Sequence, residues 1–308
     1  MNVLITGSSG SLGRHLTRAL STDPRFHSVI GVDIRKPDCL DIREPMGDLL
    51  RAHRIDTVIH AAFVVRPIRD ERLMAEINVE GSRNVLASSI AAGVQRLIHM
   101  SSATVYGFHP NGGPYTEDEP CAPNPGFLYA ENKCAVERSL ASHAATGAQP
   151  SVTILRPSFL VEPDTGNPLL EYLTRRVPLL PYPAAPLQLT HMEDMVEIIR
   201  LILLNGLTGV FNVGADGALD AGWMARRLGK FPVRMPYPVL STLNAIAWRC
   251  RIPLAPTPAW AMQLLCHPWI VSSNRLLRET GYRFRYTTST AFEEFAANQL
   301  RRLPQKPA

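Results

Sequence analysis

Cysteine is scarce in this sequence, and no two cysteines form a CxxC pair. There are 5 cysteines among 308 residues, an odd number spread along a long chain. This pattern excludes a disulfide framework, and neither the cysteines nor the histidines show the spacing of metal ligands. We therefore expect no metal site and reduced thiols that serve as small packing residues. The five are Cys39, Cys121, Cys134, Cys250 and Cys266.

Long hydrophobic runs are also missing. No stretch reaches the roughly 18 uncharged apolar residues that a membrane-spanning helix needs. The nearest candidate, 195–204, contains Glu197 and Arg200 and has the pattern of an amphipathic helix. The first residues enter an apolar strand pattern without a charged leader or a small-residue cleavage site. The sequence thus predicts a cytoplasmic protein with no integral membrane span.

Positive charge is in mild excess but is not clustered. The formal net charge is +5, and lysine and arginine are scattered apart from short pairs such as Arg175–Arg176. Nucleic acid binding would need a basic stripe on one face, so no nucleic acid partner is expected. Hydrophobic residues make up 45% of the chain and charged residues 19%, which excludes a disordered protein and predicts a large buried core.

The first half alternates short β-branched runs with helical patterns. This order is typical of βαβ units and predicts an α/β fold, a Rossmann doubly wound parallel sheet. The glycine- and proline-rich segment 107–126 is expected to be a loop. We expect strands at 3–6, 29–33, 57–61, 96–100 and 152–156, and helices at 12–20, 45–52, 72–92 and 129–145.

The pattern changes after Pro157, where prolines become frequent. Proline lacks a ladder donor, so the segment that follows is not expected to form regular sheet. A strand at 210–213 is expected to return to the Rossmann sheet, and the chain is expected to end in a helix at 290–302. We therefore expect a dinucleotide-binding domain at 1–157 and a smaller, mostly C-terminal α/β substrate-binding region at 158–308.

A glycine-rich loop joins the first expected strand to the first helix. Gly7, Gly10 and Gly13 have the spacing that lets backbone approach a pyrophosphate at a helix N-terminus. Asp33 follows 20 positions after Gly13, where an acidic residue accepts hydrogen bonds from the adenosine ribose. Such a carboxylate repels a 2′-phosphate, so the cofactor is expected to be NAD, although the nearby Arg35 could soften this preference.

Taken together, these and further motifs resemble those of the extended short-chain dehydrogenase/reductases, in particular the NAD-dependent epimerase/dehydratase group. Motifs similar to the family's are Asp41-Ile42, His60-Ala61-Ala62, Asn78-Val79-Glu80-Gly81, Met100 to Gly107, Tyr129-Ala130-Glu131-Asn132-Lys133 and Leu155-Arg156-Pro157. The resemblance implies an NAD site made by Gly7, Gly10, Ser11, Leu12, Gly13, Asp33, Asp41, Ile42, Ala61, Ala62, Phe63, Asn78, Tyr129, Lys133, Pro157 and Ser158. It also implies a homodimer through the helices at 72–92 and 129–145.

The family's catalytic residues match Ser102, Tyr129 and Lys133 here. Tyr129 and Lys133 are four positions apart and so share one helix face. A phenol has an unperturbed pKa of about 10, and we expect the Lys133 ammonium and the oxidised nicotinamide to lower the pKa of Tyr129. Tyr129 would then exchange a proton with a substrate hydroxyl or carbonyl. Ser102, rather than Ser101, would hold the substrate oxygen.

The substrate stays open between a nucleotide sugar and a hydrophobic alcohol or ketone such as a 3β-hydroxysteroid. The stretch after Pro157 lacks the asparagine usual in sugar-nucleotide members, and the apolar region Tyr237–Trp269 suggests a pocket or lid. Ala103 and Thr104 replace the acidic pair of a dehydratase, whereas epimerisation remains open. In the resembling family, the aspartate matching Asp194 caps the helix that follows it. A non-catalytic NAD(P)-sensing regulator is the alternative, although retention of Tyr129 and Lys133 favours an enzyme.

Overall fold

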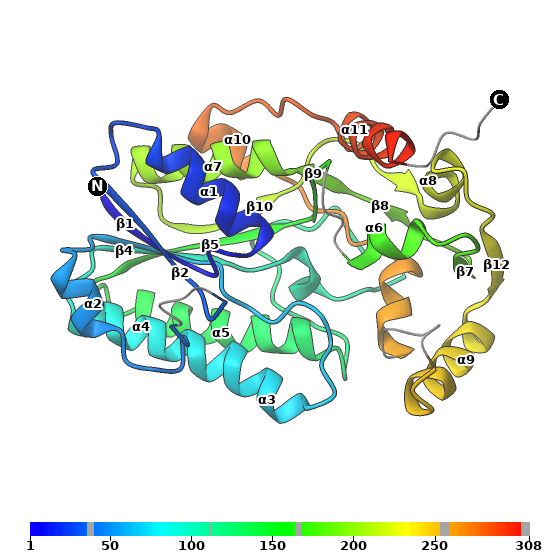
Figure 1. The fold of residues 1–308 in the computed structure, drawn as a ribbon, viewed down its shortest axis with the longest axis horizontal. Coiled ribbons are helices and arrows are strands. Elements are labelled where there is room, and N and C mark those ends of the chain that lie inside the picture. Colours follow the sequence, from blue (N-terminus) through cyan, green and yellow to red (C-terminus); the bar gives the residue numbers. More distant parts are fainter. Residues whose placement is uncertain (36–39, 111, 164–167, 253–258, 303–308) are drawn as a thin grey trace.

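A six-stranded, all-parallel sheet forms the centre of the fold in the computed structural model, which describes residues 1–35, 40–110, 112–163, 168–252 and 259–302 (Figure 1). The strand order is β2-β1-β3-β4-β5-β10. The direction of winding reverses beside β1, which is the point where α/β sheets bind ligands at their carboxyl ends. The strands are β1 (Asn2–Thr6), β2 (Ser28–Val32), β3 (Thr57–His60), β4 (Arg96–Met100), β5 (Ser151–Pro157) and β10 (Gly209–Val213).

Helices cover both faces of this sheet, as the expected Rossmann fold requires. Figure 1 shows α1 (Ser11–Ser21), α7 (Met192–Asn205) and α10 (Asn274–Thr280) on one face, with α2 (Gly47–Ala52), α4 (Gly81–Ala91) and α5 (Leu128–Ala144) on the other. Side chains along a strand alternate between faces. Val3 and Ile5 therefore pack with α1 and α7, whereas Leu4 packs toward α4.

The helix expected at 72–92 contains a wider turn that the sequence did not predict. It consists of α3 (Glu71–Ala75), a π-helical turn, η1 (Glu76–Glu80), and then α4. Asp70 caps α3 by accepting a hydrogen bond from the Leu73 N–H at 2.9 Å. Such π turns within α-helices occur often at functional sites. Here the turn contains Asn78, whose side chain is fully buried.

The expectation of no regular sheet after Pro157 is wrong in part. Short strands pair there as β6 (Phe159–Val161) with β9 (Leu189–His191), β7 (Leu179–Tyr182) with β12 (Val233–Pro236), and β8 (Pro186–Leu187) with β11 (Leu219–Asp220). A two-stranded pair leaves one edge of each strand without a ladder partner, and proline is tolerated at such an edge. The expected return of 210–213 to the central sheet is confirmed, because β10 pairs in parallel with β5.

The second half of the chain also has a core of its own. Leu170, Leu180, Met224 and Phe292 are among the side chains of this core, all of which come from residues after 160. The division of the chain at residue 157 stays a prediction. The remaining helices are α6 (Pro168–Leu173), α8 (Ala221–Arg227), α9 (Tyr237–Arg249), η3 (Ala259–Leu265) and α11 (Thr288–Arg301).

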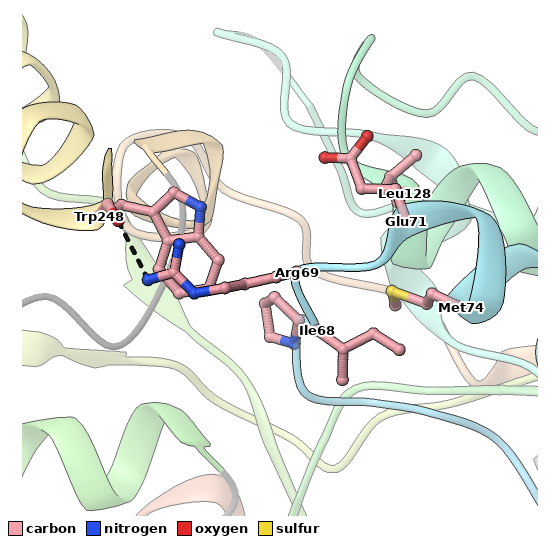
Figure 2. Close-up of a pocket in the computed structure, with 7 residues that line it drawn as sticks. Ile68, Arg69, Glu71, Met74, Leu128 and Trp248 are labelled. Carbon is pink, nitrogen blue, oxygen red and sulfur yellow. Dashed lines mark hydrogen bonds between the residues drawn. The ribbon is translucent and has the colours of Figure 1, made fainter. Parts of the chain in front are cut away.

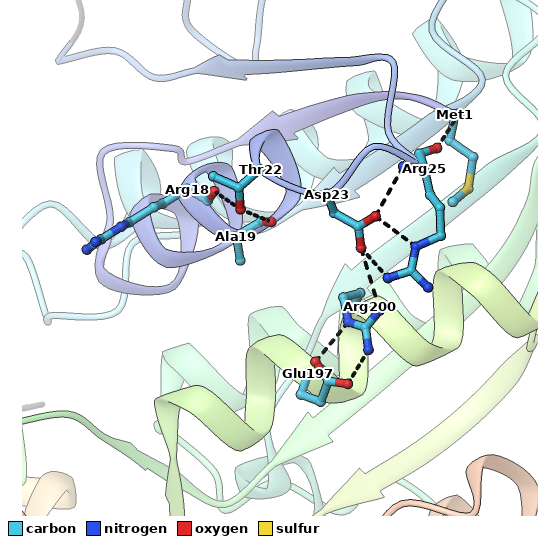
Figure 3. A network of polar contacts seen from close by, with 8 residues as sticks. All are labelled: Met1, Arg18, Ala19, Thr22, Asp23, Arg25, Glu197 and Arg200. Carbon is cyan, nitrogen blue, oxygen red and sulfur yellow. Dashed lines mark hydrogen bonds and ion pairs between the residues drawn. The ribbon is translucent and has the colours of Figure 1, made fainter.

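An ion-pair network joins the turn after α1 to helix α7 (Figure 3). Asp23 accepts a hydrogen bond from Arg25 Nε at 2.7 Å and lies 3.5 Å from Arg200 Nη1. Arg200 in turn donates to Glu197 at 2.8 Å. The hydrogen bond from Arg25 lowers the pKa of Asp23 to about 2. This contact aligns α1, whose N-terminus carries the glycine loop, against α7.

Asp194 does not cap helix α7, contrary to expectation. The N-terminal cap is His191, whose Nδ1 accepts a hydrogen bond from the Glu193 N–H at 3.2 Å. The buried Asp194 carboxylate instead accepts hydrogen bonds from the Tyr282 hydroxyl at 2.5 Å and the Arg285 N–H at 2.9 Å. It therefore fixes the segment after α10 onto α7, which is a structural role.

Among the described residues, no helix is both long and apolar enough to cross a membrane. The expectation that every cysteine is a packing residue holds for Cys134, which is fully buried, but not for Cys250, which is exposed. Cys39 lies outside the described residues.

Candidate active site

The glycine loop lies where β1 meets β3 at the carboxyl edge of the sheet. Gly7 has a φ of +72°, and a Cβ there would stand 2.6 Å from the Ala62 nitrogen. A Cβ on Gly13 would stand 2.2 Å from the Gly7 carbonyl oxygen. Helix α1 begins at Ser11 with Gly10 as its cap and with no side-chain cap. Its first-turn N–H groups therefore point to the loop, as a pyrophosphate site requires.

Asp33 follows β2 and bonds to both the glycine loop and Arg35. Its carboxylate accepts hydrogen bonds from the Ser9 N–H at 3.0 Å and from the Arg35 N–H at 2.9 Å. The Arg35 side chain also pairs with it at 3.1 Å. Burial opposes ionisation of Asp33, but these hydrogen bonds outweigh it and keep the pKa below its usual value. Asp33 is thus an ionised acceptor beside the loop.

The residues expected to contact adenine lie in the loop between β2 and α2. Asp41 pairs with Arg43, and Ile42 is buried against Gly81 at the start of α4. Asn84 donates to the Ile42 carbonyl at 2.7 Å and so holds this loop on α4. The contact of Asp41 and Ile42 with adenine stays a prediction.

Asn78 fixes the segment that follows β3. Its Oδ1 accepts a hydrogen bond from the Val64 N–H at 2.7 Å, and its Nδ2 donates to the Val64 carbonyl at 3.2 Å. This two-point contact positions the run Ala61-Ala62-Phe63, which ends beside the glycine loop and beside helix α5. Asn78 therefore acts through the backbone of Val64 in the described structure.

Ser102, Tyr129 and Lys133 are brought together at the carboxyl end of β4. Ser102 caps a short 3₁₀ turn, η2 (Ala103–Tyr106), and its hydroxyl accepts hydrogen bonds from Thr104 N at 3.2 Å and Thr104 Oγ1 at 3.0 Å. Tyr129 lies in the first turn of α5, beside the Ser102 hydroxyl. Lys133 follows one turn later, with its Nζ 5.9 Å from the centre of the Tyr129 ring.

Phe63 contacts both members of the YxxxK pair, which the sequence did not reveal. The Lys133 ammonium nitrogen lies 3.4 Å from the centre of the Phe63 ring, and this ring meets Tyr129 edge-on at 5.7 Å between centroids. Lys133 also donates to the Met100 carbonyl oxygen. A cation over a ring face is attracted by the ring quadrupole. Phe63 thereby helps to hold Lys133 near Tyr129.

The expected lowering of the pKa of Tyr129 by Lys133 is not found. Burial raises the pKa of Tyr129 to about 12, against the opposing effect of the hydrogen bond with Ser102. Burial also holds the pKa of Lys133 well below its usual range, with Glu137 acting in the other direction. Desolvation therefore outweighs the charge of the lysine in the protein itself, and at neutral pH Tyr129 is a protonated phenol.

Two buried histidines, His60 and His99, lie close to Lys133. His60 exchanges hydrogen bonds with Thr6 and Ser82, both at 2.8 Å, whereas neither ring nitrogen of His99 has a hydrogen-bond partner within the part of the chain that is described. Burial, aided by Lys133, lowers the pKa of His60 to about 3 and that of His99 well below its usual value. Both rings are therefore neutral at neutral pH.

Because of these two histidines, we expect the free energy of unfolding to fall in acid. The unfolded chain protonates each histidine below about pH 6.5, whereas the folded chain does not until near pH 3 for His60. Between these values the unfolded state binds more protons, so the free energy of unfolding falls as pH falls. We expect His99→Leu to reduce this slope below about pH 6, by at most about 1.4 kcal/mol per pH unit, measured by urea unfolding. The exposed His53→Leu is the control, and an equal slope in both variants would contradict the assignment.

Ser101 belongs to a separate buried network. It donates to the Glu137 carboxylate, which also pairs with Arg156 at 2.6 Å. Arg156 donates further to the Tyr106 hydroxyl at 2.7 Å. Both charged side chains are almost fully buried. Ser101 and Arg156 therefore fix β4 and β5 to helix α5, while Ser102 faces Tyr129.

Pro157 and Ser158 lie at the end of β5, on the same edge of the sheet. The Ser158 N–H donates to the Val213 carbonyl at 2.8 Å, and its hydroxyl is hydrogen-bonded to Thr190 Oγ1 at 2.8 Å. These contacts link the end of β5 to β10 and β9. A role of Pro157 and Ser158 in cofactor binding stays a prediction.

Glu162 is a residue at the site that the sequence did not identify. It follows β6, is buried, and accepts hydrogen bonds from the Ser11 hydroxyl and from His15 Nε2, the latter at 2.5 Å. A carboxylate is favoured at the N-terminus of a helix by the free N–H groups and the dipole. Ser11 and Glu162 are 151 positions apart, and no sequence motif predicts their contact.

A small pocket of about 90 Å³ opens beside the N-terminus of α5 (Figure 2). Arg69 lies over the Trp248 ring, 4.8 Å from its centre, and donates to the Trp248 carbonyl oxygen at 3.2 Å. Leu128, the first residue of α5, lines the pocket and directly precedes Tyr129 in the sequence. Its walls are Pro67, Ile68, Arg69, Glu71, Met74, Leu128 and Trp248.

Two known proteins are similar in sequence to most of this chain. An uncharacterized protein of Mycobacterium tuberculosis (strain ATCC 25618 / H37Rv) is 28% identical over 95% of this chain and 82% of its own length. A ceramide reductase of Caulobacter vibrioides (strain NA1000 / CB15N) is 30% identical over 88% of this chain and 86% of its own length.

A solved structure of UDP-glucose 4-epimerase from Thermus thermophilus in complex with NAD has the same fold. It covers 98% of this chain and 100% of its own, with a TM-score of 0.74 and 20% identity. The family model described as "NAD dependent epimerase/dehydratase family" matches residues 3–214, which is more than half of the chain. The chain therefore belongs to the NAD dependent epimerase/dehydratase family, whose members are extended short-chain dehydrogenase/reductase enzymes that use NAD.

Proposed function

We propose that this protein is an NAD-dependent oxidoreductase that acts on a hydroxyl or carbonyl carbon of a hydrophobic substrate. The observation that carries the proposal is the convergence of Ser102, Tyr129 and Lys133 at the carboxyl end of β4, on the same edge of the sheet as the glycine loop. A hydroxyl and a phenol that meet in this way can hold one substrate oxygen between them.

Each residue has a role that follows from its position. Tyr129 gives a proton to a carbonyl oxygen or takes one from a hydroxyl, and its raised pKa favours the protonated form that reduction needs. Ser102 donates to the same substrate oxygen and stabilises the charge that develops there. Lys133 would bind the nicotinamide ribose from below. When bound, NAD supplies the hydride donor or acceptor.

The residues of the glycine loop and Asp33 fit the rest of the cofactor. The close approach at Gly7 and Gly13 leaves space that a side chain would fill, and the N-terminus of α1 carries no side-chain cap. Asp33 would accept hydrogen bonds from the adenosine ribose. We retain the remaining cofactor-binding residues as proposals: Gly10, Ser11, Leu12, Asp41, Ile42, Ala61, Ala62, Phe63, Asn78, Pro157 and Ser158.

Two observations favour an apolar substrate. The segment Tyr237–Trp269 is rich in apolar residues, and the stretch that directly follows Pro157 lacks the asparagine usual in sugar-nucleotide members. The ceramide reductase, which is similar over most of this chain, is named for a lipid substrate. A nucleotide sugar, as named for the epimerase of the same fold, is the second candidate.

A paired substrate screen tests the proposal. We expect NADH oxidation with long-chain or sterol-like ketones, followed at the nicotinamide absorbance. Epimerisation consumes no net cofactor, so chromatographic separation of UDP-glucose from UDP-galactose is needed to detect it. Sugar interconversion without ketone reduction would replace our substrate class. Bound NAD with no turnover on either panel would favour an NAD(P)-sensing regulator.

Cofactor preference gives a second test. We expect Asp33→Ala to weaken NAD binding about tenfold or more, because it removes charge-assisted hydrogen bonds to the ribose. NADP binding should change less, since the freed Arg35 can face the 2′-phosphate. Titration of each cofactor by intrinsic fluorescence measures both effects. The fully exposed Asp48→Ala is the control, and tighter NADP than NAD binding in the parent protein would overturn the role of Asp33.

We also propose a cytoplasmic location and a homodimer through α4 and α5. These helices are neighbours, and Arg83 of α4 reaches the Ser139 hydroxyl of α5 at 3.4 Å. Analytical ultracentrifugation of the purified chain tests the dimer. A monomer at all concentrations would contradict it.

A further inference from the structure

Exposed apolar side chains are concentrated in one part of the molecule. Of twelve large hydrophobic side chains exposed among the described residues, eight belong to β7, β12, α9 and the segments next to them. Phe231 is 70% exposed and Tyr182 63% exposed. Contiguous exposed apolar area of this kind marks an interaction surface. The eight are Val177, Tyr182, Phe231, Val233, Val239, Leu243, Ile246 and Ile252.

Helix α9 contributes three of these eight exposed side chains. Val239, Leu243 and Ile246 follow helical spacing on one face, and each is about half exposed. Leu240, about a quarter turn further round the helix, is buried, and Trp248 lies on the side opposite the exposed three. A helix that covers a soluble protein normally carries polar residues on its outer face, whereas α9 is apolar on both. Figure 1 shows α9 at the outer edge of the molecule, away from the central sheet.

The two strands extend the apolar face of α9. The Phe231 N–H donates to the Arg176 carbonyl at 3.1 Å and the Val233 N–H to the Pro178 carbonyl at 3.0 Å, so the start of β12 lies beside Val177. The end of β12 pairs with Tyr182, and α9 begins at the next residue. We call this continuous region, made by the eight residues, the α9 face.

The chain segment that contains α9 carries charge of one sign. No aspartate or glutamate occurs between Asp220 and Glu279, a segment that contains eight lysines and arginines. Arg227 and Arg234 are paired with Glu293 and Asp220. Arg249 and Arg251 at the end of α9 are exposed and form no ion pair within the described residues. The eight are Arg226, Arg227, Lys230, Arg234, Arg249, Arg251, Arg275 and Arg278.

We propose that the α9 face docks on the surface of an anionic lipid bilayer. Its half-exposed apolar side chains would enter the boundary between headgroups and acyl chains, and Arg249 and Arg251 would meet the lipid phosphates. A second copy of the chain does not fit this face, because Arg249 and Arg251 of one copy would face the same arginines of the other and repel them. The inference goes beyond the proposed function, and its evidence comes only from the residues of the α9 face and the charges next to it.

Docking in this orientation would bring the bilayer close to the candidate active site. The inner side of α9 carries Trp248, which holds Arg69 in the wall of the pocket beside Leu128 (Figure 2). This consequence rests on the proposed function: a hydrophobic substrate could then leave the bilayer near Tyr129 without crossing water.

Co-sedimentation of the full chain with lipid vesicles tests the proposal, without NAD or substrate. We expect binding to vesicles of phosphatidylcholine with about one-third phosphatidylglycerol, weaker binding to pure phosphatidylcholine, and loss of binding at high salt. Leu243→Glu with Ile246→Glu should lower the partition coefficient roughly tenfold or more, and Arg249→Gln with Arg251→Gln roughly tenfold. Ile34→Glu, which changes a similarly exposed apolar residue after β2, is the matched control.

Several results would overturn docking on lipid. These are equal binding to both vesicle types at all salt concentrations, no binding to either, or an equal loss in the Ile34→Glu variant. A change of oligomeric state in the double glutamate variant, with no vesicle binding by the parent, would assign the face to a second copy instead. Turnover of a water-soluble ketone should be unchanged in the double glutamate variant, so failure of docking and failure of the proposed activity are told apart.

Discussion

Tyr129→Phe is expected to lower kcat about a thousandfold while the Kd for NAD changes less than twofold. The variant removes one oxygen atom, the only group of Tyr129 that can exchange a proton with the substrate. The ring that packs edge-on against Phe63 is kept, so the position of Lys133 should not change. Stopped-flow measurement of NADH oxidation and titration of NAD give the two quantities independently.

The matched control for this variant is Tyr182→Phe. It removes a phenolic oxygen from an exposed residue of β7 that lies outside the catalytic group. We expect full activity from it. A Tyr129→Phe enzyme with more than a tenth of the parent kcat would remove Tyr129 from its proposed role, whereas an equal loss of NAD binding would show a structural effect instead.

Glu137→Ala is expected to lower the free energy of unfolding by about 3–5 kcal/mol, because it leaves the buried Arg156 guanidinium without its carboxylate. Both side chains are about 5% exposed. Burial opposes the charge on Arg156, but Glu137 and Tyr106 hold its pKa above the usual value. The substitution also removes the acceptor for Ser101. Urea unfolding followed by circular dichroism measures the change.

A double variant separates this uncompensated charge from simple loss of packing. Glu137→Leu with Arg156→Met replaces both charges by apolar side chains, and such replacements of a buried ion pair often cost little or nothing. We expect the double variant to recover at least half of the stability lost in Glu137→Ala. If both variants lose stability equally, the pair itself, rather than the unpaired charge, stabilises the fold.

The sequence predicted the parts of the fold that local patterns control. Alternating runs and helical spacing located the strands of the central sheet, and the glycine spacing placed the loop of Gly7 and Gly13 between β1 and α1. The spacing of Tyr129 and Lys133 on one helix face was likewise predictable, because four residues make about one turn. In each case, neighbours in the sequence are also neighbours in space.

The features that the sequence did not predict depend on contacts between distant segments. Glu162 reaches Ser11 across 151 positions, and the burial that raises the pKa of Tyr129 comes from packing rather than from neighbours in α5. The strands β7 and β12 were missed because proline was expected to exclude pairing, although one edge of a two-stranded pair needs no donor.

The return of β10 to the sheet has a consequence for how this chain can be divided. Residues 209–213 form the edge next to β5, and α7 covers the same hydrophobic cluster as α1. A fragment that stops at residue 157 would expose the backbone groups of β5 and the apolar side of α1 to water. The two halves therefore cannot be inherited or exchanged as separate modules, and a chimera has to transfer α7 and β10 together with the nucleotide-binding half.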